Sequence, residues 1–75
     1  MTKYSLYKYT ATADHEPENY YQYAGQNGIK AWIWTYCDLR DAVTALADFE
    51  SRCKPIEDGR FQVICYALEP QEADS

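Results

Sequence analysis

Residues 29–37, IKAWIWTYC, form the most strand-like segment of the chain, and residues 38–54, DLRDAVTALADFESRCK, follow it with helical spacing. β-Branched and aromatic side chains dominate the first segment, and both of its alternating faces are largely apolar. That pattern is typical of an interior strand. The two faces carry Ile29, Ala31, Ile33, Thr35 and Cys37, and Lys30, Trp32, Trp34 and Tyr36.

The helix is expected to begin at Asp38, whose side chain can cap unpaired backbone amides. Asp41 suits the positive first turn, and Pro55 prevents the helix from continuing. Apolar residues recur at spacings of three and four and form one stripe, which consists of Leu39, Ala42, Val43, Leu46, Phe49 and Cys53.

The remaining segments are assigned by composition. Residues 3–12 are rich in Tyr and Thr and predict a first strand, and residues 13–19 predict a polar loop. Residues 57–59 predict a turn, and residues 60–68 predict the last strand. Residues 69–75, EPQEADS, are expected to form a mobile acidic tail.

Residues 20–28, YYQYAGQNG, fit two interpretations. A short strand closed by a turn at Asn27 and Gly28 would form a hairpin with the segment that follows. A single helical turn, begun at Pro17 and stopped by Gly25, is the alternative. We favour the strand.

These elements predict one domain spanning residues 1–75, with a folded core at 3–68. The fold class is α+β, with one helix packed on one face of a small, mostly antiparallel sheet of three or four strands. The expected order is strand, possible strand, strand, helix, strand.

The helix stripe is expected to meet one face of the sheet, formed by Ile29, Ile33, Cys37, Phe61, Val63 and Cys65. Cys53 lies on the stripe itself, so all three thiols would lie near one core as small reduced hydrophobes. The opposite face would carry Trp32, Trp34, Tyr36, Ile64, Tyr66 and Leu68. Cover by residues 20–24, a dimer interface and a docked partner are three explanations for this aromatic face.

The charge balance restricts the choice of partner. Twelve Asp and Glu face seven Lys and Arg, which gives a net charge of −5 and an isoelectric point of about 4.6. Nucleic-acid phosphates need a basic footprint, so direct binding to nucleic acid is not expected. A basic, DNA-binding protein surface is the expected partner.

No motif indicates catalysis. His15 lies between two acids in a Pro-containing loop, and the three Gly residues do not form a phosphate-binding loop. Catalytic residues, a metal and a cofactor are therefore not expected. No apolar run approaches the ~20 residues of a membrane helix, and the start of the chain lacks the features of a signal peptide, so we expect a cytoplasmic location without membrane contact.

The residues expected to bind the partner are Asp14, Glu16, Glu18, Asp41, Asp48, Glu57 and Asp58, with Trp32, Trp34 and Tyr36 as aromatic anchors. With these acids on a small scaffold of one helix and a sheet, the chain resembles, as a class, the acidic phage proteins that inhibit bacterial nucleic-acid machines, including DNA mimics and anti-CRISPR proteins. The resemblance implies a non-catalytic inhibitor, acting in the host bacterial cytoplasm, that blocks target DNA recognition by a CRISPR effector.

The alternative is a small interaction or assembly module. Its interface would be the aromatic sheet face, represented by Trp32, Trp34, Tyr36 and Tyr66. Both a monomer and a dimer are compatible with the sequence.

Overall fold

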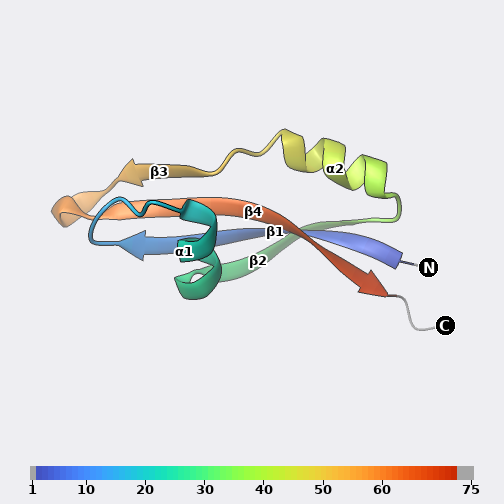
Figure 1. Ribbon diagram of the computed structural model, residues 1–75, viewed down its shortest axis with the longest axis horizontal. Coiled ribbons are helices and arrows are strands. Elements are labelled where there is room, and N and C mark those ends of the chain that lie inside the picture. Colours follow the sequence, from blue (N-terminus) through green and yellow to red (C-terminus); the bar gives the residue numbers. More distant parts are fainter. Residues whose placement is uncertain (1, 73–75) are drawn as a thin grey trace.

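The computed structural model describes residues 2–72 as one four-stranded antiparallel sheet with two α-helices (Figure 1). The strands lie in the order β2-β1-β4-β3. The predicted α+β class with a mostly antiparallel sheet is confirmed. In chain order the elements are β1 (Thr2–Ala13), α1 (Tyr20–Asn27), β2 (Ile29–Tyr36), α2 (Leu39–Ala47), β3 (Arg52–Pro55), the 3₁₀ turn η1 (Glu57–Gly59) and β4 (Phe61–Glu72).

The two longest strands, β1 and β4, form the centre of the sheet. They pair in one unbroken register from Thr2 opposite Glu72 to Ala13 opposite Phe61. β2 lies outside β1, so its prediction as an interior strand was wrong. The apolar residues on both of its faces therefore belong to an exposed edge strand and not to a buried interior strand. Ile29, for example, is 79% exposed.

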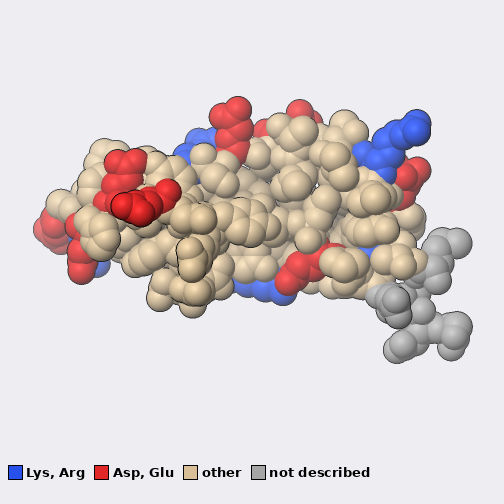
Figure 2. All heavy atoms as spheres, viewed as in Figure 1, with Lys and Arg blue, Asp and Glu red and all other residues tan. Residues whose placement is uncertain are grey.

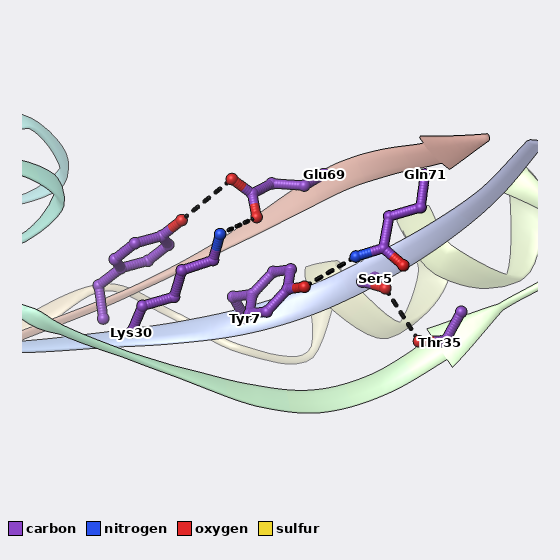
Figure 3. A network of polar contacts seen from close by, with 7 residues as sticks. Ser5, Tyr7, Lys30, Thr35, Glu69 and Gln71 are labelled. Carbon is purple, nitrogen blue, oxygen red and sulfur yellow. Dashed lines mark hydrogen bonds and ion pairs between the residues drawn. The ribbon is translucent and has the colours of Figure 1, made fainter.

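The two helices cover opposite faces of the sheet near opposite ends (Figures 1 and 3). The buried Ala24 of α1 packs against a cluster on one face, which we call the Val63 cluster and which contains Ala11, Ala13, Val63 and Cys65. α2 packs against β1, β2 and β4. The ring of Phe49, just after α2, lies 4.7 Å from that of Tyr66, whose side chain alternates to the other face.

This arrangement reverses part of the expected packing. The face with Val63 and Cys65, expected under the predicted helix after Asp38, is covered by α1 instead. Tyr66, expected on the open aromatic face, is covered by Phe49. Two helices cover the sheet where one was predicted, because the sheet has two apolar faces and each must be shielded from water.

The preference for a strand at 20–28 was wrong, and the helical alternative is closer to the structure. The Asn19 side chain caps α1 by accepting a hydrogen bond from Gln22 N at 3.0 Å. The helix passes through Gly25 and ends at Asn27, and the N–H of its C-cap Gly28 donates to Ala24 O at 2.8 Å. Tyr propensity for strands did not outweigh this cap and the burial of Ala24.

The second helix is shorter than predicted. It ends at Ala47, and Asp48 is its C-cap, with its N–H donating to Ala45 O at 3.1 Å. The residues from Arg52 to Pro55 form β3 because the open edge of β4 offers backbone hydrogen bonds to them. Cys53 therefore lies on a strand, packed against the Val63 cluster.

The predicted common core of the three thiols is confirmed only in part. Cys65 is buried and Cys53 half-buried, whereas Cys37 is exposed just beyond the end of β2. The predicted tail also needs correction, because β4 continues to Glu72 through pairing with β1. Residues 73–75 lie outside the described residues.

A pair of glycine substitutions tests this packing. A Cβ at Gly28 would press on Ala24 O and lie 2.9 Å from Thr10 O, whereas one at Gly25 would meet nothing within 4 Å. We expect Gly28→Ala to lower the free energy of unfolding by about 1–3 kcal/mol. Gly25→Ala, inside α1, should raise it by up to about 1 kcal/mol. Urea unfolding followed by circular dichroism measures both, and equal effects would contradict the packing of Gly28 against β1.

Candidate functional site

One end of the sheet collects most of the acids that the sequence singled out. Phe61 pairs with both Ala13 and Pro55, so loop 14–19 and turn η1 leave the sheet at the same end. Figure 2 shows acidic atoms gathered at this end, on the left of the view. The carboxylates carried there are all exposed, and we call them the acidic end: Asp14, Glu16, Glu18, Glu57 and Asp58.

Turn η1 holds two of these carboxylates in a defined backbone. Asp58 has a φ of 63° and Gly59 a φ of 70°, both in the left-handed region. Asp and Gly tolerate this region better than most residues. Two hydrogen bonds close the turn, from Arg60 N to Glu57 O at 3.3 Å and from Ile56 N to Arg60 O at 2.9 Å. The turn predicted at 57–59 is therefore confirmed.

Few cations neutralise the acidic end. Among residues 2–72, the one ion pair at this end joins Arg60 to Asp58, with Nη2 and Oδ2 4.0 Å apart and both side chains at least half exposed. Such pairs contribute little and are screened by salt. Glu16 instead accepts a hydrogen bond from the Tyr20 hydroxyl. That bond to a carboxylate raises the pKa of Tyr20 and leaves the negative charge in place.

An open hollow of about 320 Å³ lies between the acidic loop and one flank of α1. Its lining includes His15, Glu18, Asn19 and Tyr23, so its walls are polar and carry one carboxylate of the acidic end. The Tyr23 hydroxyl donates to Thr12 O at 2.9 Å, which fixes α1 to the end of β1. The hollow is large enough for a polar side chain of a partner.

The other two predicted contact acids lie elsewhere. Asp41 is in the first turn of α2 and Asp48 is its C-cap. α2 starts after Tyr36, which pairs with Tyr4 at the end of the sheet remote from Ala13. The structure therefore divides the predicted acidic surface into the acidic end and a separate group on α2.

The predicted aromatic anchors are divided as well. The rings of Trp32 and Trp34 stack with centroids 6.0 Å apart and planes 19° apart, and more than half of each side chain is exposed. We call these two residues the Trp pair. Trp32 Nε1 donates to Thr35 Oγ1 at 2.9 Å, which anchors one ring on β2. Tyr36 is half-buried further along the strand.

The sequence did not reveal a polar network on the uncovered half of the α1 face (Figure 3). Lys30 forms an ion pair with Glu69, and its Nζ lies 4.2 Å from the Tyr7 ring centroid. The Tyr9 hydroxyl donates to Glu69 Oε1 at 3.5 Å, and Gln71 Nε2 donates to the Tyr7 hydroxyl at 2.8 Å. Glu69 and Gln71 had been placed in the tail, and no local pattern indicated their pairing with β1.

Among residues 2–72, every group with a clearly shifted pKa is shifted upward. Burial raises the pKa values of the Cys53 and Cys65 thiols and of Tyr9 and Tyr21. The hydrogen bond to Glu69 raises the pKa of Lys30.

Within residues 2–72, no three side chains of His, Cys, Asp or Glu gather closely enough to hold a metal ion. No helix in that range has the length and apolar character needed to cross a bilayer. Comparison of the chain with protein-family models, with curated proteins and with solved structures gave no match.

The raised pKa values predict a loss of stability in alkali. Folding holds protons on Tyr9, Tyr20, Tyr21, Cys65 and Lys30 that the unfolded chain releases at lower pH. The free energy of unfolding should therefore fall as the pH rises from about 8.5, where free thiols ionise, through the tyrosine range. Urea unfolding between pH 7 and 11 measures the slope, and a flat profile would contradict the burial and the hydrogen bonds that raise these pKa values.

Proposed function

We propose that this protein is a non-catalytic inhibitor that binds a basic, nucleic-acid-binding surface of a protein complex by imitating DNA phosphates. The observation that carries the proposal is the acidic end. Loop 14–19 and turn η1 bring five exposed carboxylates together there, and the one ion pair at this end has a long N–O distance. Uncompensated negative potential on a small scaffold attracts surfaces rich in Lys and Arg.

The physical action is electrostatic and steric. A net charge of −5 steers the molecule toward a cationic groove and raises the association rate at low salt. The molecule is elongated, 48 × 22 × 18 Å, so its narrow acidic end can enter a groove while the rest of the sheet remains outside. The hollow beside Glu18 can receive one basic side chain of the partner.

The most specific form of the proposal is an anti-CRISPR protein that blocks target DNA recognition by a CRISPR effector. Its support is the class resemblance in size and acidity together with the clustering of acids at one end. Such effectors hold nucleic acid in positively charged channels and read a short duplex motif with Arg side chains, so they offer the kind of surface that the acidic end complements. The site of action would then be the bacterial cytoplasm.

A second function is supported by the Trp pair, which lies on the edge strand β2 and is more than half exposed. Residues 29–36 contain no carboxylate and one Lys, so this edge strand carries no negative charge of its own in an otherwise acidic molecule. Exposed aromatic patches of this kind mark protein interfaces. On this alternative the protein is an interaction or assembly module, and salt does not weaken its binding strongly.

Charge reversal at the acidic end tests the inhibitor proposal. The variant Asp14→Lys/Glu18→Lys/Glu57→Lys is compared with Asp41→Lys/Asp48→Lys/Glu50→Lys, which changes the net charge equally but elsewhere. Each protein is immobilised and exposed to bacterial lysate at about 50 and about 500 mM NaCl, and captured proteins are identified. We expect the native protein and the α2 variant to capture DNA-binding proteins at low salt, and the acidic-end variant to lose them.

Competition then separates mimicry from general stickiness. Duplex DNA added to the column should release the captured protein, and the native protein should in turn inhibit DNA binding by that captured protein once it is purified. Equal loss of capture in both variants would show that net charge alone acts. Capture that survives DNA and reversal at the acidic end would overturn the proposal.

Replacement of one tryptophan tests the second function. We expect Trp34→Ala to leave the far-ultraviolet circular dichroism spectrum and the melting temperature nearly unchanged, since the side chain is 58% exposed. It should abolish self-association, measured by sedimentation velocity, or binding of a captured partner. Leu39→Ala, at a comparably exposed apolar site on α2, is the control. If the native protein is monomeric and Trp34→Ala leaves partner binding unchanged, the Trp pair is not an interface.

A further inference from the structure

We infer that a second cavity, on the sheet side of α1, binds an organic cation of the guanidinium or alkylammonium class. The cavity has a volume of about 260 Å³, and we call it the cation pocket. Two tyrosines and one carboxylate contribute to its lining, namely Tyr9, Tyr21 and Glu69, and Gly25 and Cys65 lie beside them. It is separate from the hollow at the acidic end, which lies on another flank of α1.

The carboxylate of the pocket has capacity for a second cation. Its Oε2 atom pairs with Lys30, while its Oε1 atom accepts only the Tyr9 hydroxyl, at 3.5 Å. That distance is at the outer limit of a hydrogen bond, so the interaction is weak. A carboxylate offers about four acceptor positions. Glu69 can therefore accept a charged N–H donor from the pocket without losing Lys30.

Two tyrosines line the pocket together with this carboxylate, and the Tyr9 hydroxyl contacts it directly. Burial raises the pKa values of both tyrosines; the negative charge of Glu69 is the next cause for Tyr9, and for Tyr21 it follows the Cys65 thiol. Tyrosine rings attract cations through their negative π-faces. Two such rings beside a carboxylate provide the chemistry that recognises guanidinium and ammonium groups.

Lys30 shows the same chemistry at the other oxygen of the Glu69 carboxylate. Its ammonium lies 4.2 Å from the centroid of the Tyr7 ring and pairs with the carboxylate (Figure 3). The cation pocket repeats this combination with Tyr9 and Tyr21 in place of Tyr7. On this inference a ligand cation would share Glu69 with Lys30, each cation having its own tyrosine neighbours.

The size and polarity of the cation pocket restrict the class of ligand further. The volume is below the ~300–1,000 Å³ of pockets for drug-sized molecules, so a single side chain or a small amine fits. Ala67 and the Cys65 thiol form an apolar part of the lining, because that thiol already donates a hydrogen bond to Tyr21 O at 3.9 Å. An apolar lining favours a weakly hydrated guanidinium or alkylated ammonium over an inorganic ion. The net charge of −5 disfavours anions.

The two sources of such a cation are a basic side chain of a protein and a free amine. Three probes distinguish them: propylguanidinium, tetramethylammonium, and a capped Gly-Arg-Gly peptide. Propylurea, which has a similar shape without charge, is the control ligand. Each is titrated into the ¹⁵N-labelled protein at physiological ionic strength, and backbone amide shifts are followed by nuclear magnetic resonance.

We expect the cations, and not propylurea, to shift the amides of residues 21–25 and 65–69. Glu69→Gln should weaken binding roughly tenfold, and Tyr21→Leu about fivefold, whereas Tyr21→Phe should retain it. Gly25→Leu should abolish binding by filling the pocket, since a Cβ at Gly25 has nothing within 4 Å and leucine favours helices. Because Gly25→Leu leaves the Glu69 carboxylate and its ion pair with Lys30 in place, it tests the pocket even if Glu69→Gln disturbs the fold.

Tighter binding of the peptide than of the small cations would identify a docking point for a basic protein, and the reverse order would identify a small-molecule site. Equal shifts with propylurea, shifts scattered over the molecule, or unchanged binding in Gly25→Leu would each overturn the inference. Glu57→Gln removes a charge from the acidic end alone. It should leave the pocket unaffected, so the inference and the proposed inhibitor function can fail separately.

Discussion

The pairing of β1 with β4 is the constraint on which the rest of the structure depends. Its unbroken register places Ala13 beside Phe61 at one end and Thr2 beside Glu72 at the other. That register brings two acidic segments, remote in sequence, to one end, and it places Glu69 beside the side chains of β1 that line the polar network. A shift by one residue would turn every side chain of a strand to the opposite face, so both candidate sites require this register.

Local patterns were sufficient for the elements with local causes. The first strand, the cap at Asp38 and the turn at Glu57–Gly59 were predictable because the responsible residues are neighbours in sequence. The helix at Tyr20–Asn27 and the strand at Arg52–Pro55 were missed for the opposite reason. Both are stabilised by surfaces that only the folded sheet provides, the Val63 cluster for the helix and the open edge of β4 for the strand.

The same distinction applies to the sites. Charge counting identified the five carboxylates of the acidic end, but it could not separate them from Asp41 and Asp48, because only strand pairing shows which loops share an end. The cation pocket was beyond sequence reasoning altogether. Tyr9, Tyr21 and Glu69 come from three distant segments, and none belongs to a recognisable motif. A cavity built by tertiary contact leaves little trace in residue spacing.

The two edges of the sheet differ in a way that limits how copies of the chain can associate. β3 has only four residues, with Arg52, Lys54 and Pro55 among them, and such short, charged, proline-containing strands resist pairing. β2 offers eight residues with no carboxylate. Each molecule therefore has only one edge strand, β2, that can pair with another copy. Two copies joined there form a closed twofold particle with no remaining end to extend, so fibrils cannot propagate by this route.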